Sequence, residues 1–129
     1  MTHRFPLRVY YEDTDFGGIV YYANYLKFIE RGRSEWVRDM GIDQVALKLD
    51  EGVVFAVRHI EADYHSPAHF DDELVVKTAV EAVTGARWIV RQTVERGGEV
   101  LFSALVTVVA INEAGAPTRL PAAFRRNLN

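Results

Sequence analysis

The stretch YEDTDFGGIVYY, residues 11–22, lies where a predicted strand gives way to a predicted helix. Before it, apolar and polar side chains alternate over Arg4–Glu12, which is the pattern of a half-buried strand. After it, apolar residues recur at helical spacing from about residue 24 to residue 40. Within it, Gly17 and Gly18 allow backbone angles that other residues rarely adopt, so the chain can turn sharply here.

The predicted helix has one apolar face and a glycine, Gly41, at its expected end. The face consists of Leu26, Phe28, Ile29, Arg33, Trp36, Val37 and Met40. Gly32 lies inside the helix, where glycine costs about 1 kcal/mol relative to alanine. We therefore expect another backbone to approach the helix closely at Gly32.

Beyond the helix the sequence predicts strands. Residues 41–52 fit either a short second helix or an irregular loop. Period-two alternation or β-branched residues predict strands over Val53–His65, Glu73–Val83, Arg87–Arg96 and Glu99–Asn112. Gly97-Gly98 predicts a two-residue hairpin turn between the last two. After Gly115 and Pro117 we expect a frayed tail.

One strand, one long helix and four antiparallel strands predict a single α+β domain over residues 1–129. An antiparallel sheet with one solvated face must cover its other face, and the long helix is the only large element that can do so. Pro6 places the first strand at a sheet edge. Such edges favour self-association, so we expect a homodimer or a homotetramer.

Composition excludes several classes of function. The chain has no cysteine, which rules out disulfides, thiolate metal sites and a cysteine nucleophile. Its net charge of −3 disfavours nucleic acid as a partner. The longest apolar stretch, residues 104–111, is far too short to cross a bilayer, and residues 1–10 lack the apolar core of a signal peptide. We therefore expect a cytoplasmic protein without a transmembrane segment.

Residues 11–25 bring acidic side chains, glycines and a helix start together. The unpaired N–H groups of a helix start carry partial positive charge and can hold a carbonyl oxygen as it becomes an oxyanion. A neighbouring carboxylate can attack the carbonyl carbon or take a proton from water. The same pattern is typical of helix caps, so by itself it leaves acyl transfer and capping both open. For Asp13 we expect turn stabilisation through its own backbone.

Residues 11–22, continued by Asn24-Tyr25 and Phe28-Ile29-Glu30-Arg31, resemble the signature of the 4-hydroxybenzoyl-CoA thioesterase group. Within that group they most resemble the tol-pal-associated acyl-CoA thioesterase branch. Residues 62–64, 66–68 and 71–74 are also similar to this family, so the resemblance spans nearly the whole chain. It implies the hotdog fold, in which a five-stranded antiparallel sheet wraps around one long central helix. It also implies hydrolysis of acyl-CoA-type thioesters to free acid and thiol, with no cofactor and no metal.

The resemblance assigns two catalytic positions. Asp15 matches the family's catalytic aspartate, which is implied to act as a nucleophile or as a general base. Tyr22 matches the position whose backbone N–H, at the start of the helix, polarises the thioester carbonyl. Gly17 and Gly18 match the turn that brings these groups near each other. Tyr22 stands where the tol-pal-associated branch usually has histidine, so that imidazole is missing here.

Further substrate contacts are expected at two places. The family's sites lie at a dimer interface, which implies that Tyr64, Ser66 and Pro67 of the partner chain complete the pocket. Arg87 and Arg91 are candidates for the phosphates of CoA, because arginine binds phosphate with two parallel hydrogen bonds. Arginines on a strand are more often part of a solvated surface.

Two other groups of polar residues are given non-catalytic roles, a structural contact for the first and a solvated or interface face of a strand for the second. Glu30 lies on the predicted helix at partner spacing to Arg33 and Ser34, so we expect an ion pair or a structural contact. A set of alternating polar residues shares one face of the second strand, with a spacing that matches no standard zinc motif. These are His59, Glu61, Asp63 and His65.

Two alternatives to hydrolysis remain. A hotdog dehydratase or isomerase acting on thioesters needs a base for a carbon-bound proton, commonly histidine, and no histidine lies between Arg4 and Arg58. A non-catalytic acyl-binding scaffold would bind acyl-CoA without hydrolysing it.

Overall fold

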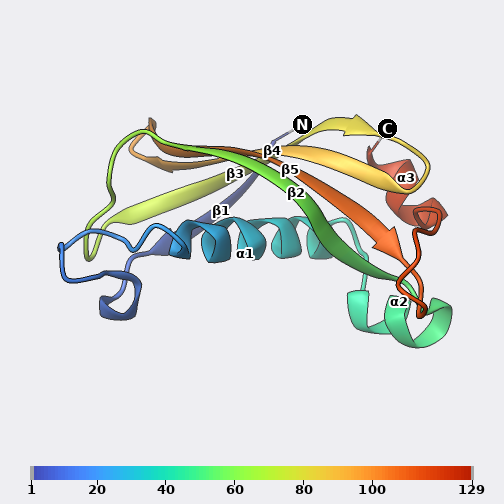
Figure 1. Ribbon diagram of the computed structural model, residues 1–129. Helices are drawn as coiled ribbons and strands as arrows, with labels where there is room; N and C mark the ends of the chain where they lie inside the picture. The colour runs from blue at the N-terminus through green and yellow to red at the C-terminus, as the bar shows by residue number, and fades with distance from the viewer. Residues whose placement is uncertain (1, 129) are drawn as a thin grey trace.

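The computed structural model describes residues 2–128, which form one five-stranded antiparallel sheet with a long helix against it (Figure 1). The strands are β1 (His3–Arg8), β2 (Val54–Tyr64), β3 (Glu73–Val83), β4 (Arg87–Arg96) and β5 (Glu99–Ile111). Their order across the sheet is β1-β3-β4-β5-β2, and every neighbouring pair is antiparallel. The helix α1 (Asn24–Asp39) runs along one face of the sheet. The predicted order of elements and the α+β class are confirmed.

The first strand is shorter than predicted. It ends at Arg8, and Tyr11–Asp13 form a single 3₁₀ turn, η1, in place of the strand's last residues. The Asp13 carboxylate accepts a hydrogen bond of 2.8 Å from the Tyr10 N–H, which turns the chain away from the sheet. The alternating pattern therefore continues past the residue at which pairing with β3 stops. As Pro6 indicated, β1 lies at one edge of the sheet.

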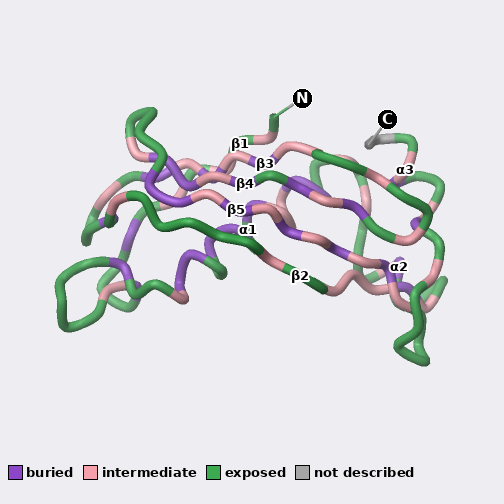
Figure 2. Tube along the Cα trace, turned by 45° about the horizontal axis from the view of Figure 1, so that its top comes forward, coloured by how far each residue is buried: buried purple, intermediate pink, exposed green. Residues whose placement is uncertain are grey.

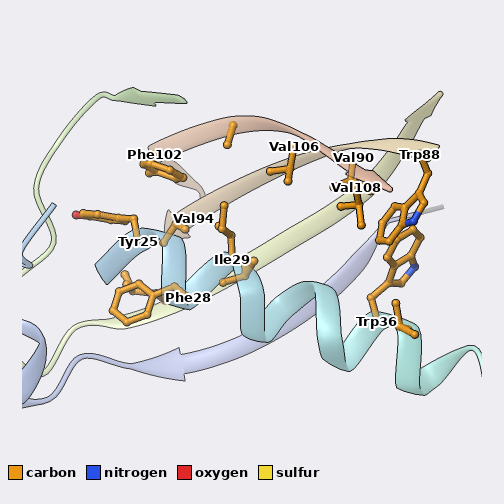
Figure 3. Packing of buried hydrophobic residues seen from close by; sticks show 14 of the residues in the cluster. Tyr25, Phe28, Ile29, Trp36, Trp88, Val90, Val94, Phe102, Val106 and Val108 are labelled. Carbon is orange, nitrogen blue, oxygen red and sulfur yellow. The ribbon is translucent and has the colours of Figure 1, made fainter. Parts of the chain in front are cut away.

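The core lies between α1 and the concave face of the sheet (Figure 3). Alternate residues of β4 and β5 point toward the helix, as their burial pattern shows. Two large ring contacts lie at opposite ends of this core: Tyr25 stacks on Phe102, and Trp36 packs against Trp88. The prediction for Leu26 is wrong, because this side chain is 42% exposed and its neighbour Tyr25 is buried in its place.

Gly32 contacts the sheet more closely than a side chain would permit. A Cβ atom at this position would lie 2.6 Å from Val76 Cγ1, a distance that real Cβ atoms do not show. The neighbour is thus a valine side chain of β3, and our expectation of a close backbone was wrong. Beside it, fully buried Gln92 donates from Nε2 to the Ile29 carbonyl and to Thr78 Oγ1, and its Oε1 accepts from Arg33. This buried side chain is therefore paired at both its amide nitrogen and its amide oxygen.

Two short helices complete the chain. Residues 44–51 form α2 (Gln44–Glu51), which begins at Asp43, whose carboxylate accepts from the Ala46 N–H, and ends at Gly52. The short-helix alternative for residues 41–52 is thereby confirmed. The tail prediction is wrong: residues 122–128 form α3 (Ala122–Leu128). Its Phe124 is fully buried against Trp88 and Phe55, which explains why the tail is folded.

The strand β2 forms the second edge of the sheet and is the least covered strand (Figure 2). It pairs with β5 on one side only, and none of its residues is fully buried. The strand β2 thus gives the sheet a long, exposed edge.

Gly97 and Gly98 form the predicted hairpin turn between β4 and β5, with φ angles of 56° and 88°.

Candidate active site

The segment between η1 and α1 is folded around the buried Asp13. Besides binding the Tyr10 N–H through its carboxylate, Asp13 accepts at its backbone carbonyl from the Tyr21 N–H at 2.9 Å. The same carbonyl accepts from the Asn24 side-chain amide at 2.9 Å, and Asn24 is the first residue of α1. The structural role expected for Asp13 is confirmed. This residue fixes the start of the helix against the end of the turn.

Asp15 lies in a tight turn within this segment. Its carbonyl accepts from the Gly18 N–H at 3.0 Å, and its N–H donates to the Ile19 carbonyl at 3.1 Å. One carboxylate oxygen, Oδ1, accepts from the Gly17 N–H at 2.9 Å. Gly18 has φ of +82°, which a residue with a side chain adopts only with strain. The two glycines thus serve the turn as predicted, and the Asp15 side chain is exposed and open to a ligand.

Tyr22 lies between this turn and the helix. Its neighbours are tied down, because the Tyr21 N–H binds the Asp13 carbonyl and the Asn24 N–H binds the Tyr21 carbonyl at 2.8 Å. Within residues 2–128, the Tyr22 N–H has no hydrogen-bond partner, whereas its carbonyl accepts from the Tyr64 hydroxyl at 2.9 Å. The start of α1 therefore presents an available donor at the position that the sequence indicated.

A second loop, residues 65–72 between β2 and β3, lies against the Asp15 turn. The Val20 N–H donates to the Ala68 carbonyl at 2.9 Å, and Ile19 and His69 form an antiparallel bridge. The buried Ala68 donates its own N–H to the Tyr25 hydroxyl at 3.1 Å. Two loops that are distant in sequence thus pair through their backbones at the start of α1.

Between these loops and α1 lies an open cavity of about 330 Å³. Most of its lining is apolar or aromatic, and the lining residues are Ile19, Val20, Tyr22, Tyr25, Tyr64, His65, Ser66 and Pro67. The predicted substrate contacts Tyr64, Ser66 and Pro67 therefore come together with Tyr22 within one chain, whereas we expected them from a partner. Asp15 is not part of the lining and lies on the turn that leads into it.

Three tyrosines form an aromatic cluster at this cavity. Tyr64 contacts the rings of Tyr22 and Tyr25 edge-on, with centroids 6.2 and 5.6 Å apart. Burial raises the pKa of Tyr64, and the neighbouring Tyr22 and Tyr25 hydroxyls add to this effect. Burial likewise raises the pKa of Tyr25, against the opposing hydrogen bond from Ala68. Both phenols are therefore neutral near pH 7 and act as hydrogen-bonding groups.

The structure does not bring Arg87 and Arg91 to this cavity. Both point to the face of the sheet opposite α1, alternating with the buried Trp88 and Val90. Arg91 is paired with Glu81, with Nε and Oε2 3.3 Å apart. The prediction for them rested on residue type, and strand alternation places them on the face of the sheet away from this cavity, so a contact with the phosphates of CoA stays a prediction.

Glu30 has the structural contact that its spacing indicated. Its carboxylate accepts from the Ser34 hydroxyl at 2.6 Å. Burial lowers the pKa of Arg33, while the nearby Glu30 charge opposes that effect. These residues line a second hollow of about 260 Å³ beside β2, together with Phe55 and Val57 among others. It holds no part of the Asp15 turn, so we place the chemistry at the first cavity.

Several site residues carried no clear signal in the sequence. Ile19 and Val20 look like ordinary apolar residues, and His65 looks like the last member of a polar strand face. They become part of the site only because loop 65–72 folds back onto the turn. The role of Asn24 could have been predicted from the sequence, because an amide side chain at a helix start commonly binds nearby backbone.

Neither a metal centre nor a membrane helix is found in the described part of the chain. Across residues 2–128, no three His, Asp or Glu side chains gather to hold a metal ion. His59 and Glu61, from the polar face of β2, make one exposed contact of 3.5 Å. No helix in the same range is both long and apolar enough to span a bilayer.

Comparisons with known proteins agree on one family. A profile of the thioesterase superfamily matches residues 17–103. The acyl-CoA thioesterase YbgC of Haemophilus influenzae is 42% identical over 108 residues, which is 84% of this chain and 79% of that protein. The range that the profile matches contains every residue that lines the cavity and begins two positions after Asp15.

Solved structures place the same elements in the same arrangement. The crystal structure of a probable thioesterase from Bartonella henselae is 43% identical, with a TM-score of 0.89 over 94% of this chain and 100% of that chain. A mutant of 4-hydroxybenzoyl CoA thioesterase, crystallised with 4-hydroxybenzoyl CoA, is 20% identical with a TM-score of 0.93 over 99% of each chain. At that identity the second likeness shows the fold alone. The hotdog fold is thereby confirmed.

Proposed function

The chain belongs to the thioesterase superfamily, and on this premise we propose that it hydrolyses acyl-CoA thioesters at the cavity beside the start of α1. Family membership makes it a thioester hydrolase. Acyl-CoA is the substrate class named for the Haemophilus influenzae relative, which covers most of this chain. Hydrolysis needs only a carboxylate, an oxyanion donor and water. A dehydratase or isomerase needs a base for a carbon-bound proton, and a scaffold would bind acyl-CoA without hydrolysing it.

The observation that supports this site best is the available Tyr22 N–H at the cavity, together with the exposed carboxylate of Asp15 on the turn that leads into it. A thioester carbonyl that accepts from this N–H is polarised, and the helix start stabilises the oxyanion that forms. In the net reaction, a water oxygen becomes bonded to the acyl carbon and the carbon–sulfur bond breaks. The thiolate of CoA takes up the proton that the water loses. The rigid backbone around Asp13 holds the donor in place throughout.

Asp15 fits two versions of this reaction. As a general base it takes the proton of the attacking water. As a nucleophile it attacks the acyl carbon and displaces the thiolate of CoA by breaking the carbon–sulfur bond, and water then opens the resulting anhydride to the free acid and the Asp15 carboxylate. Repeated turnover in ¹⁸O-labelled water separates them, because only the nucleophilic version can carry the label into the Asp15 side chain. Mass spectrometry of the peptide that contains Asp15 reads out the label.

The direct test compares the rates at which Asp15→Asn and the wild type hydrolyse a panel of acyl-CoA substrates, with the release of free thiol as the readout. Because the amide is neither a base nor a nucleophile, we expect kcat to fall about 100-fold or more. Asp50→Asn is the matched control, since Asp50 is an exposed acid on α2 that is remote in the sequence from the turn. Wild-type turnover by Asp15→Asn would remove Asp15 from the mechanism.

We also propose that two copies of the chain pair through β2. This strand is an eleven-residue edge with a free side, whereas the other edge, β1, has six residues and contains Pro6. Antiparallel pairing over its whole length would set the Val54 end of each β2 beside the Tyr64 end of the other. The hollow at Phe55–Val57 of one copy would then face the Tyr22 cavity of the other.

Val57→Glu tests this pairing, because Val57 is an apolar residue of β2 with half of its surface exposed. In this register residue 57 of one copy lies opposite Glu61 of the other, so the introduced carboxylate faces an existing one, and we expect light scattering after gel filtration to show a shift toward monomer. Val45→Glu, at an exposed apolar position of α2, is the control and should leave the assembly unchanged. An unaltered mass for Val57→Glu would contradict pairing through β2.

A further inference from the structure

One ion pair spans the loop that supports the candidate active site. Arg96, at the end of β4, donates from NH1 to Asp72 Oδ2 at 2.7 Å and to the Pro67 carbonyl at 3.3 Å. Its second nitrogen, NH2, contacts Glu99 on the other side of the hairpin at 3.2 Å. The guanidinium thus connects the β4–β5 hairpin with both ends of the loop over residues 67–72.

Asp72 also closes this loop from within. Its Oδ2 accepts from the His69 N–H at 2.8 Å, and its own N–H donates to the His69 carbonyl at 3.2 Å. Burial raises the pKa of Asp72, but the His69 amide and Arg96 outweigh it and hold the pKa below its usual range. The carboxylate is therefore charged whenever the protein works near neutral pH.

The loop transmits this constraint to the catalytic backbone. Pro67 lines the cavity, and the adjacent Ala68 accepts from the Val20 N–H and donates to the Tyr25 hydroxyl. Val20 is two residues before Tyr22, whose N–H is the proposed oxyanion donor. The path from Arg96 to this donor therefore runs from the Arg96 side chain to the Pro67 carbonyl, along the chain to Ala68, and through one backbone hydrogen bond to Val20.

We propose that Arg96 and Asp72 are positioning residues for thioester hydrolysis, which set the backbone of Pro67–His69 and through it the Tyr22 N–H. This inference rests on the proposed function of the same cavity. Neither side chain touches the cavity itself, and both are partly exposed, so their contribution to overall stability is modest. Their effect is on geometry, to which catalysis is far more sensitive than folding.

The test uses Asp72→Asn, Arg96→Gln and the double variant, with kcat, KM and the melting temperature measured for each. We expect kcat to fall about 10-fold to 100-fold while KM changes little, because the thioester carbonyl is misplaced only by a small distance relative to the Tyr22 N–H. The double variant should be no slower than the slower single one, since the two residues act as a unit. Arg96→Lys keeps the charge and should recover part of kcat.

Two further measurements separate positioning from a merely structural role. Arg38→Gln breaks the exposed Arg38–Glu35 ion pair near the end of α1 and should leave kcat unchanged. Hydrogen exchange at the Val20 and Ala68 amides should accelerate in Asp72→Asn and Arg96→Gln and stay unchanged in Arg38→Gln. Normal kcat in the first two variants, or a lower kcat without faster exchange at these amides, would overturn the proposal.

Failure of the proposed function would be recognised separately. A wild type that releases no thiol from any acyl-CoA would contradict hydrolysis, and the exchange rates would still decide whether Arg96 and Asp72 hold the loop. An active wild type with unaffected variants would contradict the positioning role alone.

Discussion

Gly32 lies in the middle of α1, where the helix packs against Val76 of β3. Alanine there would favour the helix by about 1 kcal/mol, but its Cβ would lie 2.6 Å from Val76 Cγ1. Overpacking of this kind costs about 1–3 kcal/mol. We expect Gly32→Ala to lower the free energy of unfolding by about 1 kcal/mol, as measured by urea denaturation.

A second substitution tests the reason for this loss. The substitution Val76→Ala removes the opposing methyl groups. Gly32→Ala should therefore lower the free energy of unfolding less in the Val76→Ala background than in the wild type. Lys27→Ala, at an exposed position of the same helix, is the control and should change stability by less than about 0.5 kcal/mol. A Gly32→Ala protein that is more stable than the wild type would contradict the contact.

At the scale of single residues, the sequence predicted the site unevenly. The turn role of Asp13 and the turn glycines followed from residue type and position, and the structure confirms both. Residue type did not place Arg87 and Arg91, since charge alone does not say on which face of a strand a side chain lies. Arg96 and Asp72 could not be connected from sequence, because 24 positions separate them and only loop geometry brings them together.

At the scale of elements, periodicity predicted the long strands and α1 nearly to their ends. The errors occur where a tertiary contact overrides the local pattern. The first strand stops early because Asp13 captures the Tyr10 N–H. The tail becomes α3 because Phe124 finds a pocket against Trp88, a contact that no local pattern announces.

The helix face shows the same limit. Helical spacing selected Leu26 for the core, but Tyr25 fills that place because its ring stacks on Phe102 and its hydroxyl binds the Ala68 N–H. Tyr25 shares its helical spacing with the buried Ile29 and Gly32, so the regular helix buries Tyr25 and leaves Leu26 exposed. This element is positioned by the candidate site as much as by the core.

At the scale of the whole molecule, two carboxylates connect folding with pH. The pKa of Asp72 is lowered by His69 and Arg96 against the opposing effect of burial, and that of Glu95 by Lys77 and Thr93 against the same effect. A depressed folded-state pKa contributes stability that is fully present above the unfolded pKa and is lost as the pH falls through the folded pKa. We therefore expect the free energy of unfolding to fall progressively below about pH 5.

Urea unfolding of the wild type and of Asp72→Asn at neutral and acidic pH checks this linkage. The variant should start from a lower stability near pH 7 and lose less of it on acidification, because its amide cannot be protonated. Asp50→Asn should keep the wild-type slope, since Asp50 makes no ion pair within residues 2–128. Equal slopes for the wild type and Asp72→Asn would contradict a contribution from Asp72.

The strand order has a consequence for how the chain assembles. β3, β4 and β5 follow one another through short turns, so they form a meander from local contacts alone. β1 can join this meander only after a long loop closes, since Arg8 and its partner Glu73 are 65 positions apart. We therefore expect the meander to be the folding nucleus. During synthesis, α1 leaves the ribosome before β3 and β4, which pack against it, and its apolar face is then a natural target for a chaperone.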